Sequence, residues 1–291
     1  MSADACTQGL DTGFIELGAA KVAALGVVQG ISELLPISST AHMRIVPALL
    51  GWRDPGSAFS AAMQMAALAA VVSYFWSDVR GLVFGSIDAL RRRDFHDWNL
   101  RFTTWILLAT LPLVIFGTLL SKWLNACGTP LRSLPVIGVA CIVMAVLLAL
   151  AEKFCAHRRT LDNVSLKDAM LVGIAQAGAL IPGVSRSGST LTAAMFLDLE
   201  RDQAARFSFL LGLPAIFLAG AREFYELYKA NLSADGWMIL AVGLVVASIS
   251  AFVAIWSLMR ILEKFSSWPF VVYRFLLGVF LLAGVALGWL Q

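Results

Sequence analysis

Residues 26–42 read GVVQGISELLPISSTAH, and residues 173–190 read GIAQAGALIPGVSRSGST. Each stretch starts with glycine and has glutamine three residues later, then passes through a short apolar run to a proline and a cluster of serines. Further along, Phe59-Ser60 is matched by Phe207-Ser208. All three landmarks recur at nearly the same offset, close to half the length of the chain. The pattern predicts an internal duplication.

Prolines interrupt both motif segments. Pro36 in the first segment, and Pro182 with Gly183 in the second, stop a helix. Glu33 and Arg186 are ionisable residues, and a charged side chain at membrane depth is costly, so both are expected to have a function. We therefore expect each segment to form a re-entrant helix–loop–helix hairpin, which enters and leaves on the same side of a membrane.

Each repeat continues with three apolar segments. The first repeat is expected over residues 14–152 and the second over residues 165–290. The expected spans are 58–77, 102–121 and 133–151, and then 207–221, 236–259 and 265–290. Three crossings are an odd number, so the second repeat must be inverted relative to the first. The predicted fold is an all-α polytopic membrane protein with an inverted-topology repeat, forming a single membrane domain over residues 1–291.

The composition excludes an ordinary soluble domain. The chain has 291 residues, is 59% hydrophobic and 14% charged, and has a mean hydropathy of +0.80. Soluble domains are about 45–50% apolar and roughly 25% charged. Core helices of a large soluble protein would carry polar faces, which the long uncharged runs of this chain lack. The net charge of +3 is small and the basic residues gather in loops, so no nucleic-acid partner is expected.

The basic loops predict the orientation in the membrane. Loops 78–101, 152–167 and 260–264 fall on one side of the predicted threading and hold eleven Lys and Arg residues. Loops 122–132 and 222–235 fall on the other side and hold four. Because cytoplasmic loops are enriched in Lys and Arg, the first side is expected to be cytoplasmic.

The two hairpin tips hold the residues that suit phosphate chemistry. Each tip begins a new helix, whose N-terminus offers free N–H groups and a partial positive charge. The first tip is expected to be capped by Ser38 or Ser39, and the second by Ser185. Two such N-termini, joined by Arg186 and several hydroxyls, would make a phosphate-sized anion site. Its expected ligands are Ser38, Ser185, Arg186, Ser187 and Thr190.

A divalent cation and a nucleophile are expected beside that anion site. Gln29 and Glu33 lie four residues apart, so they share a helix face, and their oxygens suit Mg²⁺ or Ca²⁺. The nucleophile is either Ser39 with His42 as its base, or His42 itself. Less specific interpretations also exist. Serines after a proline are often only helix caps, and Glu33 with Arg186 could form a buried structural pair.

The motifs resemble those of the bacterial undecaprenyl-diphosphatase family, also called the bacitracin-resistance proteins. The resemblance rests on Gln29-x-x-x-Glu33, on residues 36–42 (PISSTAH) and on residues 182–190 (PGVSRSGST). It implies hydrolysis of undecaprenyl diphosphate to the monophosphate and phosphate, which recycles the lipid carrier of cell-wall synthesis. By resemblance, Glu33, Ser39, His42, Ser185, Arg186 and Thr190 take the family's active-site positions. Gln29 departs from the pattern, because many members carry Glu there.

The resemblance also implies a divalent cation, a location in the bacterial inner membrane and a site that opens to the outer face. The expected partners are a polyprenyl diphosphate lipid, the membrane and, as a further candidate, a second copy of the chain. A transporter or flippase of a polyprenyl phosphate lipid is the alternative, because secondary transporters also use inverted repeats and broken helices. A carrier would need Arg186 but not Ser39, His42 and Glu33 together, so their co-occurrence favours the enzyme.

Overall fold

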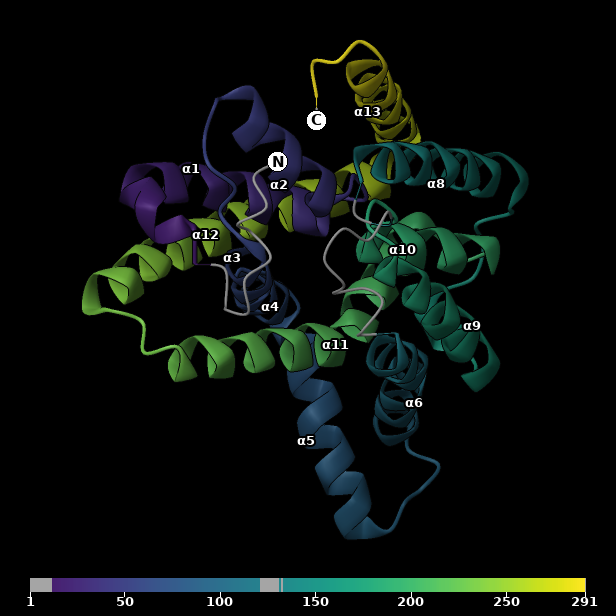
Figure 1. Cartoon of the computed structure of the whole chain (residues 1–291). Coiled ribbons are helices and arrows are strands. Elements are labelled where there is room, and N and C mark those ends of the chain that lie inside the picture. Colours follow the sequence, from purple (N-terminus) through teal and green to yellow (C-terminus); the bar gives the residue numbers. More distant parts are fainter. Residues whose placement is uncertain (1–11, 121–130, 132, 291) are drawn as a thin grey trace.

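A computed structural model describes residues 12–120, 131 and 133–290, and this part of the chain folds as a bundle of helices (Figure 1). The α-helices, in chain order, are α1 (Phe14–Leu34), α2 (Ser39–Leu49), α3 (Ser57–Ala62), α4 (Gln64–Tyr74), α5 (Trp76–Arg92), α6 (Trp98–Leu119), α8 (Leu134–Phe154), α9 (Leu166–Ala177), α10 (Arg186–Phe196), α11 (Arg201–Lys229), α12 (Ala234–Lys264) and α13 (Trp268–Ala286). Two short 3₁₀ turns, η3 (Leu161–Asn163) and η4 (Gly178–Leu180), flank α9.

Six helices in the described part are long and apolar enough to cross a membrane, namely α1, α6, α8, α11, α12 and α13. A seventh span arises if the bent pair Ala58–Tyr74 and Trp76–Arg92 counts as one. The chain is therefore a multi-pass, all-α membrane protein, as its composition predicts. Of the expected loop 122–132, all but Leu131 lies outside the described residues.

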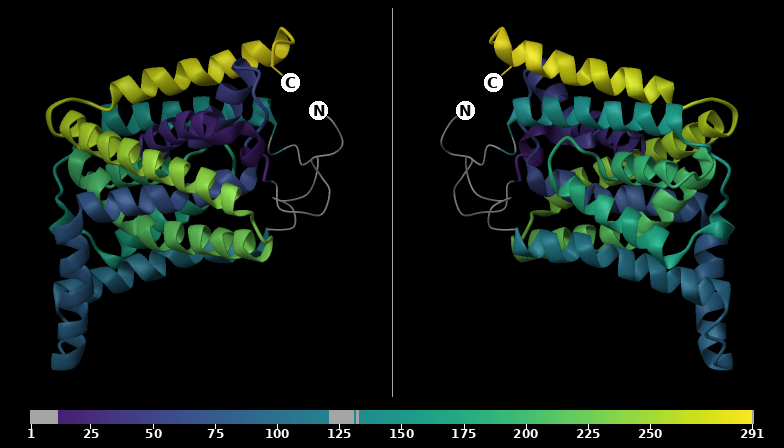
Figure 2. Two further views of the ribbon diagram at one scale, coloured as in Figure 1. Left: turned by 90° about the vertical axis from the view of Figure 1, so that its left-hand side faces the viewer. Right: turned by 90° about the vertical axis from the view of Figure 1, so that its right-hand side faces the viewer.

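The expected loop 78–101 is wrong over most of its length, because the structure forms α5 there. This helix bends away from α4 by 84°, and Figure 2 shows it at one end of the bundle, pointing across the direction of the long helices. Asp78 and Arg80 end the uncharged run. The exposed apolar residues recur at roughly helical spacing, as one face of an amphipathic helix does: Val83, Phe84, Ile87 and Leu90. The segment is thus an amphipathic helix rather than an irregular loop.

Small residues allow the long helices to pack closely. A Cβ at Gly26 of α1 would lie 2.8 Å from the carbonyl oxygen of Gly243 on α12. Similarly, a Cβ at Gly278 of α13 would lie 2.7 Å from the carbonyl oxygen of Gly138 on α8. Backbone-to-backbone approach of this kind replaces the hydrophobic driving force that helices lack within lipid. These contacts hold α1 and α13, which carry parts of the candidate site, firmly against their neighbours.

Candidate active site

Two serines at the hinge between consecutive helices define the site, because each begins a new helix after the preceding one has ended. Ser38 follows Pro36 and caps α2, where its hydroxyl accepts a bond from the Ala41 N–H at 3.4 Å. Ser185 caps α10 in the same way, accepting from the Gly188 N–H at 3.2 Å. Both serines have positive φ values, 73° and 67°. Such backbone is strained for a side-chain-bearing residue and persists only where the surroundings enforce it.

An ion pair joins the two tips. Arg186 in the first turn of α10 donates from Nη2 to Glu33 Oε1 at the end of α1, at 3.1 Å. The two side chains are only 11% and 7% exposed. On its other side the guanidinium lies against the backbone of Gly212 on α11, where any side chain would overlap it. Residues from the two halves of the sequence therefore share one buried charge pair.

Glu33 is the centre of the polar contacts at the first tip. Its Oε2 accepts from Ser39 Oγ at 2.7 Å and from Gln29 Nε2 at 3.1 Å. The other amide atom, Gln29 Oε1, is buried and has no hydrogen-bond partner among the described residues. A carboxylate that bonds a hydroxyl on one oxygen and a guanidinium on the other orients both groups. It also leaves an oxygen-rich corner with an unused acceptor.

The remaining hydroxyls of the second tip are largely engaged with protein. Ser187 donates to the carbonyl oxygens of Glu33 and Leu35, each at 3.2 Å, and also lies 3.2 Å from Ser185 Oγ. Thr190 donates to the Arg186 carbonyl at 2.8 Å and contacts the Ser208 hydroxyl of α11. Ser187 thus links the second tip to the first by hydrogen bonds, while Thr190 links α10 to α11.

His42 does not pair with Ser39, although the two lie one turn apart. Its Nδ1 lies 2.8 Å from the Ser38 carbonyl oxygen, and its Nε2 lies 2.6 Å from the Tyr273 hydroxyl of α13. Ser39 bonds to Glu33 instead. The expected Ser39–His42 pair is therefore not formed in this structure, because each side chain is bonded to a different partner.

A buried arginine holds both tips from α13. Arg274 is only 1% exposed, and it donates from Nη1 to the Pro36 carbonyl at 3.2 Å and from Nη2 to the Gly183 carbonyl at 2.6 Å. The same Nη2 also reaches the Val184 carbonyl. Carbonyl groups next to a proline break have lost their helical partners, and a fork of donors can satisfy several of them at once. Arg274 therefore links the two breaks.

Comparison with known protein families shows which family the sequence matches. The family model described as "Bacitracin resistance protein BacA" matches residues 22–280, a range that includes both tips and Arg274.

The chain belongs to the BacA family.

Curated relatives cover nearly the same length. An "Undecaprenyl-diphosphatase 2" of Mesorhizobium japonicum is 72% identical over 263 residues, which make up 90% of this chain and 100% of the relative. An "Undecaprenyl-diphosphatase" of Gloeobacter violaceus is 48% identical over 275 residues, covering 94% of both chains. One of Trichormus variabilis is 45% identical over 268 residues, covering 92% of this chain and 84% of the relative.

In this BacA-family chain the structure brings most of the predicted residues together. Glu33, Gln29, Ser39, Arg186 and Ser187 form one connected network. His42 borders it through Ser38. Sequence reasoning missed two residues, Tyr273 and Arg274. A signal for Arg274 was present, since a lone arginine within the apolar segment 265–290 is unusual at membrane depth.

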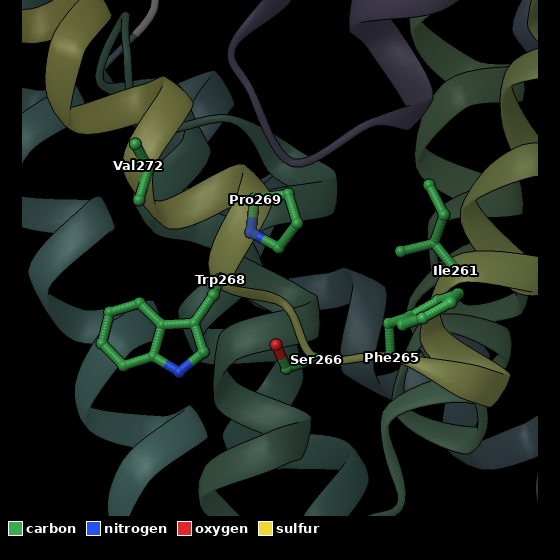
Figure 3. Close-up of a pocket in the computed structure, with 6 residues that line it drawn as sticks. All are labelled: Ile261, Phe265, Ser266, Trp268, Pro269 and Val272. Carbon is green, nitrogen blue, oxygen red and sulfur yellow. The ribbon is translucent and has the colours of Figure 1, made fainter.

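An apolar hollow elsewhere on the BacA-family bundle is not this site. A depression of about 650 Å³ lies beside the connection between α12 and α13, and Figure 3 shows the residues that line it. It is lined by Ile261, Phe265, Ser266, Trp268, Pro269 and Val272. None of these residues belongs to the network around Glu33, and the lining offers no charged group to bind a phosphate. We therefore place the chemistry at the tips.

Proposed function

We propose that this chain hydrolyses undecaprenyl diphosphate to undecaprenyl phosphate and inorganic phosphate, which returns the carrier lipid to cell-wall synthesis. Its membership of the BacA family and the printed names of its relatives support this activity. The observation that carries the chemistry is the Glu33–Arg186 pair with the Ser39 hydroxyl bonded to it, between two helix N-termini. A lipid carrier would have no use for that hydroxyl.

The terminal phosphate is proposed to bind between the N-termini of α2 and α10. Helix N-termini attract anions through their free N–H groups and the helix dipole. Arg186 adds a planar fork of donors suited to phosphate oxygens. Ser38 and Ser185 cap these helices, and Ser187 and Thr190 lie in the first turns of α10, so all four are proposed as polar neighbours of the diphosphate.

Ser39 is the nucleophile that the hydrogen bonds favour. In this scheme Ser39 Oγ attacks the terminal phosphorus and passes its proton to Glu33 Oε2, to which it is already bonded. The anhydride P–O bond breaks, and undecaprenyl phosphate leaves with the bridging oxygen. Water then attacks the phosphoserine, giving its proton to His42, while Glu33 returns the first proton to Ser39. Direct attack by His42 remains the competing scheme.

A divalent cation, Mg²⁺ or Ca²⁺, fits the donor set at Glu33. The Glu33 carboxylate, the unpartnered buried Gln29 Oε1 and the Ser39 hydroxyl are oxygen donors of the kind that hard cations prefer. The described residues contain no group of three or more His, Cys, Asp or Glu side chains that could hold a metal. Glu33 and Gln29 would therefore hold the cation together with phosphate oxygens. When bound, it would neutralise phosphoryl charge and polarise the phosphorus.

The purified protein is expected to release inorganic phosphate from undecaprenyl diphosphate, and EDTA is expected to reduce that release by at least about tenfold, because the cation offsets phosphoryl charge in the transition state. Phosphate release is measured in detergent with and without EDTA, and again after Mg²⁺ or Ca²⁺ is restored. Absence of turnover under all these conditions would contradict the proposed enzyme and favour a carrier. Full activity in EDTA would contradict the cation alone.

We infer that α1–α2 and α9–α10 are the two re-entrant hairpins of an inverted repeat within a single domain. Helix α1 has 21 residues but is interrupted by a kink at Gly18, where φ is 73°. Helices α2, α9 and α10 have 11, 12 and 11 residues, so at 1.5 Å per residue they reach about 16–18 Å. That is too short to cross a hydrocarbon core roughly 30 Å thick. In Figure 2, α5 and the α12–α13 connection lie at one end of the bundle, and the α11–α12 connection lies at the other.

The proposed orientation puts the basic end in the cytoplasm and opens the site to the outer face of the bacterial inner membrane. Single cysteines at Asp94, Asn163 and Ala234 in a cysteine-free background test this, because the first two lie at the basic end. A membrane-impermeant thiol reagent on intact cells is expected to label position 234 at least about tenfold more than positions 94 and 163, since loop charge dictates sidedness. Equal labelling of 94 and 234 would contradict the inverted repeat. Permeabilised cells, in which all three should react, are the control.

A further inference from the structure

The two ring nitrogens of His42 contact different groups. The chemistry of those groups shows which nitrogen carries the hydrogen. The Ser38 carbonyl oxygen, 2.8 Å from Nδ1, can only accept, so Nδ1 carries the hydrogen. In the neutral ring Nε2 then has a free lone pair. The Tyr273 hydroxyl, 2.6 Å from Nε2, is therefore the donor in that bond. The atom of His42 that would take a proton or attack phosphorus is the one that Tyr273 holds.

Tyr273 is not a chance surface neighbour of His42. It precedes Arg274, whose guanidinium is bonded to the carbonyl groups of Pro36 and Gly183 and is buried between the tips. These hydrogen bonds fix the position of α13 along its axis, and its rotation about that axis, relative to Ser38 and His42. The rings of Tyr273 and His42 are nearly parallel, with an angle of 6° between their planes and centroids 5.7 Å apart.

We propose that Tyr273 is a positioning residue for His42, an inference that rests on the proposed phosphatase activity. A phenol can donate to the lone pair of the neutral imidazole, gives that lone pair up to the attacking water during proton transfer, and can accept from Nε2–H afterwards. Tyr273 therefore pairs with His42 before and after proton transfer. Within the described residues, no carboxylate is bonded to His42, so the phenol takes the orienting place that an acidic residue often has.

If Tyr273 acted only by packing its ring, removal of its hydroxyl would be expected to have little effect. Its side chain is 45% exposed, so most of the apolar ring would survive in phenylalanine, and packing would hardly change. Only the hydroxyl would be lost. The substitution Tyr273→Phe therefore separates the hydrogen bond from the ring, and an effect that depends on His42 separates positioning from a general loss of structure.

The first test is a double-mutant cycle with phosphate release as the measurement. Tyr273→Phe is expected to lower kcat by about fivefold to tenfold, in line with the loss of one hydrogen bond, and to leave KM within about twofold. Once His42→Ala is present, Tyr273→Phe is expected to cause no further loss. Tyr225→Phe on α11, which removes another exposed hydroxyl, is the matched control and should be silent. A loss of the same size with and without His42 would overturn the proposal, as would unchanged kcat in the single variant.

The second test measures the hydrogen bond itself and does not depend on turnover. The chain has three histidines, so ¹⁵N-histidine labelling gives three ring systems, with His96 and His157 as internal references. The wild-type His42 signal is expected to show hydrogen on Nδ1, and its Nε2 resonance should move in Tyr273→Phe while the references stay. Hydrogen on Nε2, or an unmoved resonance, would overturn the proposal. A wild-type protein with these signals but no phosphate release would instead count against the proposed function.

Discussion

Replacing Ser39 by alanine is expected to lower phosphate release by about 10³-fold or more, because it removes the attacking oxygen while the charge pair remains. Single-turnover release from undecaprenyl diphosphate is the measurement. Rapid quench of the wild type should trap phosphate on Ser39 as an acid-stable ester. The matched control is Ser32→Ala. Ser32 directly precedes Ser39's partner Glu33, yet among the described residues its hydroxyl bonds only to the Val28 carbonyl of its own helix.

Direct attack by His42 would give a phosphohistidine intermediate in place of the phosphoserine. If His42 attacked directly, the trapped phosphate would be acid-labile, and Ser39→Ala would keep a substantial rate. Near-native turnover in Ser39→Ala would therefore contradict the serine mechanism. In the serine mechanism His42→Ala is expected to slow the second step, so the phosphoserine should accumulate in that variant.

Glu33→Gln and Arg186→Ala are each expected to reduce phosphate release by about 10²-fold or more, since each removes a charge aimed at the transferring phosphoryl group. Turnover and thermal stability in detergent are measured together. The swapped pair, Glu33→Arg with Arg186→Glu, restores the ion pair without restoring the positions of the charges. It should therefore recover stability but not activity. Recovery of activity in the swapped protein would mean that the pair is only structural.

A second ion pair, in which the carboxylate is buried and the arginine is partly exposed, provides the control for stability. Arg201 of α11 donates to Glu152 of α8 from Nε at 2.9 Å, and neither residue belongs to the network around Glu33. Arg201→Ala would leave the buried Glu152 carboxylate without its cation, so it should lower the melting temperature as Arg186→Ala does. Its turnover per folded molecule should nevertheless stay near the wild-type value. A similar loss of turnover in both variants would contradict the specific role of Arg186.

The features that the sequence predicted well are those with local causes. A proline or Pro-Gly followed by serine breaks and restarts a helix wherever it occurs, and Ser38 and Ser185 do cap α2 and α10. The uncharged runs 102–121, 133–151 and 236–259 lie mainly in the long helices α6, α8 and α12, whereas the run 58–77 is divided among α3, α4 and the start of α5. The α5 helix was not predicted because Asp78 and Arg80 end such a run near its start, so the segment is too charged for a membrane span although it is long enough for a helix.

The partners across the site could not be predicted, because they depend on how distant helices meet. Spacing along one helix suggested that Ser39 and His42 would pair. In the structure the helix break brings the end of α1 next to Ser39, and α13 supplies a closer partner for His42. Tyr273 lies 231 residues from His42, so no local pattern could connect them.

The position of Arg274 has a consequence for biosynthesis. A nascent chain that has released α1 to α12 into the membrane already contains every group proposed to bind the diphosphate, yet its two breaks lack the donor that joins them. Only the final helix brings that donor. Ribosome-bound intermediates should therefore hold the halves without an assembled catalytic centre, and phosphatase activity should begin only after translation of the last segment is complete.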